Sequence, residues 1–212
     1  LLNNISKKRI FLNSFVKYFF NFSDKIRFIY RDMGVDKRFY KVGVNKKNSD
    51  QYIYDIVYTG SVEDREGIIS CFKNLHKMGF KIAIISKLSN QNYQKLKSFE
   101  NISFLGELDI DSICSVYKVT KCGLNFTPNI FPFNYQTSTK TLEYSAAGLN
   151  IISNRYFWVE TFEKSRAAKI LYLDTLVNKN QIFDFDFVNA IIDDKEWNKI
   201  LKEINFKEFI EG

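Results

Sequence analysis

The chain has 212 residues, of which 45% are hydrophobic, 17% are aromatic and two are proline. This composition excludes an intrinsically disordered chain, and the length is enough for one sizeable hydrophobic core. No stretch has the ~18 consecutive apolar residues of a transmembrane helix, and no secretory leader with a small-residue cleavage site is visible. We therefore expect a folded cytoplasmic protein.

The formal net charge of +7 favours an anionic partner. The basic residues are scattered, except for a denser group near the start that comprises Lys7, Lys8, Arg9, Lys17, Lys25, Arg27 and Arg31. None of the familiar DNA- or RNA-binding modules is visible, so we expect no nucleic acid partner. Three interpretations stay open: peripheral contact with the inner face of a membrane, a phosphorylated lipid acceptor, or a solvated basic face without a partner.

The apolar pattern predicts a helix, then a connector, then strands that alternate with helices. Residues 5–22 resemble an amphipathic helix with aromatic residues near helical spacing; a strand at 25–30 and a polar connector at 32–50 follow. The other predicted strands are 52–59, 81–86, 102–105, 123–127, 150–153 and 169–173. The other predicted helices are 66–78, 90–99, 109–118 and 139–147, with an irregular loop at 129–136 and two or three helices after residue 178.

This alternation predicts an α/β fold, a Rossmann-like parallel sheet with helices on both faces. Continuous apolar strands such as Ile82–Ile85 support it, because a strand that is buried on both faces has no polar side. We divide the chain into an N-terminal helix, strand and linker (1–50), a Rossmann-like domain (51–176) and C-terminal helices (177–212).

The most informative stretch is residues 137–154, T-S-T-K-T-L-E-Y-S-A-A-G-L-N-I-I-S-N. Ser138 or Thr139 is a good N-cap, and Gly148 stands where a left-handed glycine would end the helix. The helix N-terminus attracts an anion, and Lys140 adds charge to it. Glu143, one turn later, is an acceptor for hydroxyl groups beside that anion. An anion next to a diol describes a nucleotide.

Other chemistry-bearing residues follow the predicted strands. Gly60 and Ser61 come after the strand at 52–59, and Gly106 comes after the strand at 102–105. Ligands of parallel sheets bind at the carboxyl ends of the strands, where these residues converge with the 139–147 helix. Arg65 is placed to neutralise a phosphate there.

The pattern S-x-K-x-x-E-Y-x-A-A-G resembles the nucleotide-sugar-binding signature in the C-terminal domain of GT-B glycosyltransferases, of the family-4 and CgeB types. Four further segments between about residues 31 and 174 support this resemblance: Met33–Phe39, the strand and turn Ile53–Ser61, Phe104–Gly106 and Gly123–Pro128. The resemblance implies sugar transfer from a nucleotide-diphosphate sugar, of UDP or GDP type, to a glycan or lipid-linked acceptor in surface-polysaccharide biosynthesis. It also implies that the acceptor domain is missing from this chain.

The resemblance assigns roles to single residues. Arg65 and Lys140 would stabilise the departing diphosphate without a metal, together with the turn at Gly60 and Ser61 and the helix start at Ser138 and Thr139. Glu143 would bind the ribose, and the backbone from Gly106 to Leu108 would contact the base.

The chain departs from the family pattern at two places. The cations that relatives carry in the first loop are replaced by Ser61 and Glu66, so Arg65 is the sole cation there unless Lys140 serves as the second. The second glutamate of relatives is replaced by Tyr135, so the donor sugar stays undetermined, and main-chain amides or Asn134 are the candidates to contact it.

We assign no chemistry to the remaining reactive residues. The single histidine, His76, is expected at the surface or in packing, and Cys71, Cys114 and Cys122 are expected to pack as free thiols. Two D-x-D triplets are interpreted as a helix N-cap (Asp109–Asp111) and the start of a terminal helix (Asp184–Asp186), so no metal site is expected.

Two other functions stay open. One is a nucleotide-sugar 2-epimerase on the same two-domain plan. The other is a non-catalytic module that binds a nucleotide or an anionic surface, for which the 5–22 helix would lie in a membrane interface. Packing of that helix on its own or a partner domain is the alternative.

Overall fold

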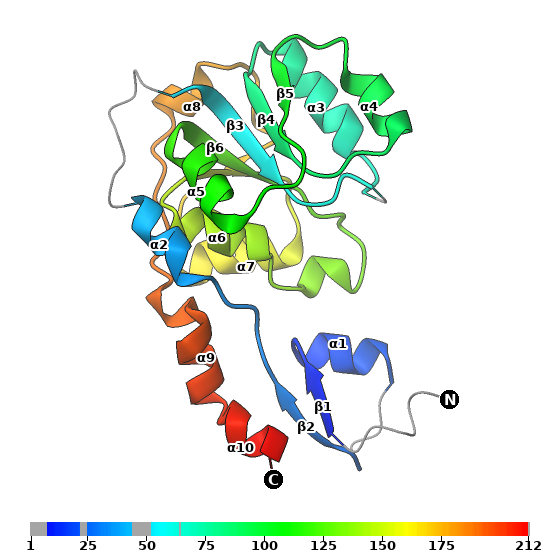
Figure 1. The fold of residues 1–212 in the computed structure, drawn as a ribbon, viewed down its shortest axis with the longest axis vertical. Helices are drawn as coiled ribbons and strands as arrows, with labels where there is room; N and C mark the ends of the chain where they lie inside the picture. Colours follow the sequence, from blue (N-terminus) through cyan, green and yellow to red (C-terminus); the bar gives the residue numbers. More distant parts are fainter. Residues whose placement is uncertain (1–7, 22–24, 44–51, 64, 212) are drawn as a thin grey trace.

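The main sheet of the computed structural model contains six parallel strands, in the order β5-β4-β3-β6-β7-β8 (Figure 1). The structure describes residues 8–21, 25–43, 52–63 and 65–211. The six strands are β3 (Tyr54–Thr59), β4 (Ile82–Ile85), β5 (Ile102–Phe104), β6 (Thr120–Asn125), β7 (Asn150–Ser153) and β8 (Leu171–Tyr172). The predicted α/β fold is therefore confirmed.

Helices cover both faces of this sheet, because neighbouring residues of a strand point to opposite sides. Ile56 belongs to the hydrophobic core beneath α3 (Ile68–Lys77), α4 (Asn90–Leu96) and α8 (Gln181–Asp184). Val57, the next residue, belongs to the core on the other face. That face is covered by α2 (Lys37–Gly43), α5 (Ile110–Lys118), α6 (Thr139–Ala146) and α7 (Phe157–Ser165).

The chain order reverses between β3 and β6. From β3 the sheet grows through β4 to β5 on one side, and from β6 through β7 to β8 on the other. The loops after β3 and β6 therefore diverge at the carboxyl edge and leave a crevice, which is where doubly wound sheets bind their ligands. The start of α6 follows β6 and faces the same edge (Figure 1).

The predicted helix at 5–22 is confirmed only in part. Residues 8–11 form strand β1 (Lys8–Phe11), which pairs in parallel with β2 (Arg27–Tyr30), and α1 extends only over Ser14–Phe19. Asn13 fixes the later helix start, because its side chain accepts a hydrogen bond from Val16 N at 2.9 Å. The pairing with β2 could not be read from local spacing. Residues 5–7 and 22 of the predicted helix lie outside the described part.

Two further predictions are corrected, and one helix was missed. The connector at 32–50 contains α2, whose start is stabilised where Asp36 accepts from Arg38 N at 2.9 Å; the Arg38 side chain lowers the pKa of Asp36 to about 2. Helix α7 was not predicted at all. Asp184 ends α8 instead of starting a helix. The loop after β6 includes a short 3-10 turn, η3 (Phe133–Tyr135).

The C-terminal helices return to the N-terminal strand pair. The 3-10 turn η4 (Asp193–Lys195) leads into α9 (Trp197–Glu203) and α10 (Phe206–Glu211), which lie beside β1 and β2 (Figure 1). Lys8 Nζ donates to Ile210 O at 2.9 Å, and the Arg31 guanidinium lies 5.3 Å from the centre of the Trp197 ring. These contacts tie the two ends of the described chain together.

Candidate functional site

A hydrogen-bonded chain fixes the start of α6 to the ends of two strands. Ser138 is the N-cap, as predicted, and its Oγ accepts from Thr141 N at 3.2 Å. The same hydroxyl donates to Asn125 Oδ1 at 2.8 Å. The Asn125 amide in turn donates to Ser153 Oγ at 2.8 Å and to Tyr156 OH at 3.0 Å. The first free amides of α6 are therefore held in place at the carboxyl edge of β6 and β7.

The end of α6 also follows the sequence prediction. Gly148 has a φ of +69°, the left-handed region that glycine adopts without strain. Leu149 N donates to Tyr144 O at 2.9 Å, which satisfies a carbonyl of the last turn. A helix of eight residues between a polar cap and a glycine stop is thus set rigidly between β6 and β7.

A cleft of about 490 Å³ opens at the carboxyl edge between β3 and β6. Six of the predicted site residues line it together: Gly60, Ser61, Arg65, Ser138, Thr139 and Lys140. Two cationic side chains and a helix N-terminus thus meet in one hollow, an arrangement that favours a phosphate or another anion.

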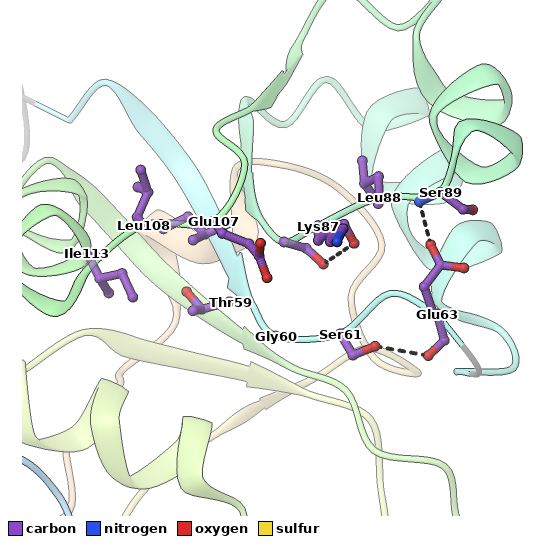
Figure 2. A pocket seen from close by; sticks show the side chains of 12 residues that line it. Thr59, Gly60, Ser61, Glu63, Lys87, Leu88, Ser89, Glu107, Leu108 and Ile113 are labelled. Carbon is purple, nitrogen blue, oxygen red and sulfur yellow. Dashed lines mark hydrogen bonds between the residues drawn. The ribbon is translucent and has the colours of Figure 1, made fainter.

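A second hollow of about 660 Å³ continues the first one toward β4 and β5 (Figure 2). The two share the backbone turn from Thr59 to Ser61 and the side chain of Glu63. Leu108, a predicted site residue, lines the second hollow. Gly106, with a φ of +71°, forms the turn just before it. The two hollows therefore form one groove across the ends of β3, β4 and β6.

Lys140 and Glu143 form an ion pair, with Nζ 2.7 Å from Oε2 and side chains 28% and 17% exposed. The lysine side chain crosses above the turn, since a Cβ built on Gly60 would lie 3.9 Å from its Cε. Glu143 is not among the residues that line either hollow. The predicted cation and the predicted hydroxyl acceptor thus contact each other.

Arg65 bridges the two loops that form the first cleft. Its Nη1 donates to Phe126 O at 2.6 Å, immediately after β6. Arg65 also lines the hollow, and its guanidinium makes no second hydrogen bond among the described residues. Arg65 therefore both fixes the width of the cleft and supplies charge to it.

A buried tyrosine pair beneath the turn was missed by sequence reasoning. Tyr144 is fully buried; its OH accepts from Thr59 N at 3.1 Å and donates to Leu124 O at 3.3 Å. Tyr117 OH donates to Thr59 Oγ1 at 3.0 Å. Burial raises the pKa of both phenols, so both keep the proton that they donate. The only sequence signal was the tyrosine that follows Glu143.

Tyr144→Phe is expected to lower the free energy of unfolding by about 1–3 kcal/mol, because it leaves the buried Thr59 N–H without an acceptor. A thermal melt should show a midpoint roughly 2–10 °C lower for a chain of this length. Tyr93→Phe is the matched control, because Tyr93 is 43% exposed. Equal midpoints for the two variants would contradict the structural role of the Tyr144 hydroxyl.

Glu63 holds the loop after β3 against the start of α4. Its Oε1 accepts from Ser89 N at 2.8 Å, and its Oε2 accepts from Asn92 Nδ2 at 3.0 Å. The bond from the Ser89 backbone lowers the pKa of this carboxyl, which is therefore ionised at neutral pH. Figure 2 shows the side chain reaching from the turn to Ser89. This contact, also not anticipated, closes one side of the second hollow.

The loop before α6 places Tyr135 outside the cleft. Phe133 and Gln136 line the first hollow, whereas Asn134 and Tyr135 do not. The Tyr135 ring lies 4.5 Å from Phe15 and 4.4 Å from Phe157, measured between ring centres. Tyr135, the position that departs from the family pattern in the sequence analysis, thus belongs to an aromatic cluster.

The residues to which no chemistry was assigned lie away from the groove or in the core. His76 stacks on Phe99, with ring centres 4.2 Å apart, and its Nδ1 contacts Asn101 Oδ1. Cys114 and Cys122 are buried. Burial also raises the pKa of the Cys71 thiol to about 12, so Cys71 is not a nucleophile.

The two D-x-D triplets have separate structural roles. Asp109 caps α5, where it accepts from Ser112 N at 2.8 Å, as predicted. Asp186 forms an ion pair with Lys169 at the surface. Within the described ranges, no three His, Cys, Asp or Glu side chains are grouped so that they could hold a metal ion. The described helices also include none that is long and apolar enough to cross a bilayer.

Three solved structures with a similar fold are GT-B glycosyltransferases. AviGT4, a glycosyltransferase involved in avilamycin A biosynthesis, matches with a TM-score of 0.60 at 8% identity, over 97% of this chain and 66% of that one. The GtfA/B complex matches with a TM-score of 0.55 at 11% identity, over 97% and 45% of the two chains. Sucrose-phosphate synthase from Thermosynechococcus elongatus matches with a TM-score of 0.52 at 13% identity, over 96% and 53%.

No protein-family model and no curated protein matches the sequence. The likeness at 8–13% identity therefore concerns the fold: this chain has the Rossmann-like α/β fold of GT-B glycosyltransferases. It spans between 45% and 66% of the length of the three chains to which it is similar.

Proposed function

We propose that this chain is the donor-binding half of a glycosyltransferase of the family-4 or CgeB type. It would transfer a sugar from a nucleotide-diphosphate sugar to a glycan or a lipid-linked acceptor, in the cytoplasm, during surface-polysaccharide biosynthesis. One observation supports this proposal above the others: Arg65, Lys140 and the N-terminus of α6 meet at the point where the strand order reverses.

The proposed chemistry is electrostatic. When the bond between the sugar and the diphosphate breaks, negative charge develops on the departing phosphate. The Arg65 guanidinium, the Lys140 ammonium and the free amides of α6 would stabilise that charge at fixed positions. No metal ion is required for this step, because the cations come from the protein.

Glu143 would bind the ribose hydroxyls in this proposal. Its Oε2 is 2.7 Å from Lys140 Nζ. Donor binding would therefore release Lys140 toward the diphosphate and turn the Glu143 carboxylate to the ribose, a rearrangement of two side chains on one helix turn.

The acceptor would bind to a second domain outside this chain. Solved structures of the same fold are longer, and the chain covers 66% of AviGT4. If the acceptor is lipid-linked, the basic residues near the start of the chain would face the inner surface of the membrane.

A thermal-shift titration with UDP, GDP, ADP, CMP and inorganic pyrophosphate, in the presence of EDTA, tests the donor site. A ligand at a hundred times its Kd adds about 2.7 kcal/mol to the free energy of unfolding. We expect one nucleoside diphosphate to raise the midpoint of the parent chain. No shift with any of these ligands would contradict the proposal.

Glu143→Ala should separate the ribose contact from the phosphate contact. We expect it to lower the affinity for the nucleoside diphosphate by roughly tenfold or more, because hydrogen bonds to a charged group are lost. Pyrophosphate should bind equally well or better, because Lys140 loses the partner that competes for it. Glu203→Ala, an exposed change on α9, is the control. Equal losses of affinity for the nucleoside diphosphate and for pyrophosphate would show that Glu143 does not contact the ribose.

A further inference from the structure

The groove has a direction if the proposed function is right, and the inference drawn here rests on that function. The cations and the helix N-terminus lie in the first hollow, so the diphosphate belongs there. The groove then continues over the turn from Thr59 to Ser61 into the second hollow. The nucleoside must occupy this continuation, and its base must reach the end near β4 and β5.

The second hollow suits a flat ring. Four apolar side chains contribute to its walls: Ile85, Leu88, Leu108 and Ile113. They come from β4 and from the segments around it, so the walls stand on both sides of the groove. Apolar walls bury the faces of a base, but they do not distinguish one base from another.

Discrimination requires polar groups, and Glu107 is placed to supply them. It follows Gly106 in the turn after β5, and it lines the second hollow. Figure 2 shows its carboxylate directed into the groove, toward the side on which Lys87 lies. Among the described residues, none donates a hydrogen bond to Glu107 or forms an ion pair with it. Its two oxygens are therefore acceptors without a donor in the described part of the chain.

A carboxylate selects a base with two neighbouring donors. It accepts only, through two oxygens side by side. Guanine presents N1–H and the N2 amino group next to each other, so both oxygens are satisfied at once. Uracil presents a single N–H between two carbonyl oxygens, which the carboxylate would repel. Cytosine and adenine each present an amino group beside a ring acceptor, so they satisfy one oxygen and oppose the other.

We propose that Glu107 determines the base specificity of the groove and that the donor is a guanosine-diphosphate sugar. Lys87 lines the same hollow, and its ammonium is available to donate to guanine O6. The lysine thus complements the third polar atom of the same edge of guanine, and a base with an amino group in place of O6 would meet a cation there.

Isothermal titration of the parent chain with GDP, UDP, CDP and ADP tests this inference. We expect GDP to bind at least tenfold more tightly than the other three. Glu107→Gln, which replaces one acceptor oxygen by a donor, should weaken GDP binding by roughly tenfold to a hundredfold. It should strengthen UDP binding, because the new amide donor would face a uracil carbonyl that the carboxylate repels. Glu100→Gln, another exposed glutamate that follows α4, is the matched control. Because Glu107 is also exposed, the thermal midpoint of the Glu107→Gln variant without added ligand should equal that of the parent chain.

The outcomes separate this inference from the proposed function. If UDP, CDP or ADP binds as tightly as GDP, or if Glu107→Gln leaves the preference for GDP intact, the base assignment is wrong while the donor site stands. If none of the four diphosphates binds, the donor site itself is wrong, and the base assignment falls with it.

Discussion

Gly123→Ala is expected to destabilise the chain by about 3 kcal/mol or more, which is the upper end for overpacking of a core. A Cβ at this position would lie 2.3 Å from Tyr144 Cγ and 2.5 Å from Cδ2. Neither side of this contact is able to move. Gly123 is in the middle of the sheet, paired with Val57 on β3 and with Ile151 on β7. The Tyr144 ring is fully buried, and its hydroxyl is bonded to Thr59 and Leu124.

Urea unfolding of the purified variants measures this effect. Gly43→Ala is the control, because a Cβ there would lie 3.4 Å from its nearest neighbours, an ordinary contact, and a helical alanine is favourable. The double variant Gly123→Ala/Tyr144→Ala removes the clash, so it should be destabilised by less than the sum of its two single variants. Additive losses, or a midpoint for Gly123→Ala equal to that of the parent, would contradict the close packing of helix α6 on β6.

The central sheet was predictable because local and tertiary preferences agree there. Ile82–Ile85 is apolar at every position, and a strand buried on both faces requires that pattern. The ends of α6 were predictable for a similar reason. The Ser138 cap and the left-handed Gly148 depend on backbone geometry that few other residues satisfy.

The predictions failed where a distant segment decides the local structure. Residues 8–11 form a strand because residues 27–30 pair with them, and this partner outweighs the aromatic spacing that suggested a helix. The N-cap of helix α7, Tyr156, makes no capping hydrogen bond through its side chain. The start of this helix therefore has no cap signal in the sequence. In both cases the decisive contact is far away in the chain or comes from packing.

The candidate site divides along the same line. Six residues of the first hollow were predictable, because glycine turns and helix starts at strand ends converge in any doubly wound sheet. The support beneath them was not. Tyr117 and Tyr144 contact Thr59 from two different helices, and no spacing in the sequence connects the three residues. The ion pair between Lys140 and Glu143 was also unforeseen, although the two residues are three positions apart on one helix.

The other large effect that we expect is the loss of ligand affinity when Arg65 or Lys140 is replaced. Arg65→Ala and Lys140→Ala should each lower the affinity for a nucleoside diphosphate by roughly tenfold to a hundredfold. This is the effect expected when a hydrogen bond to a charged group is lost in a half-buried site. Because both residues line the diphosphate end of the groove, the affinity for inorganic pyrophosphate should fall by similar factors. Lys199→Ala, which removes one exposed charge on α9, controls for the change in net charge.

The two variants should differ in what they leave behind. Lys140→Ala leaves the Glu143 carboxylate without its cation, 17% exposed, beside the incoming phosphates. Repulsion then adds to the lost attraction, so Lys140→Ala/Glu143→Ala should bind pyrophosphate more tightly than Lys140→Ala does. Arg65→Ala instead frees the Phe126 carbonyl that its guanidinium holds, so a lower ligand-free midpoint should accompany the lost affinity. Titration calorimetry with pyrophosphate and thermal melts of the four variants measure both effects. If neither single variant lowers the affinity for pyrophosphate more than the Lys199→Ala control does, the first hollow is not a diphosphate site.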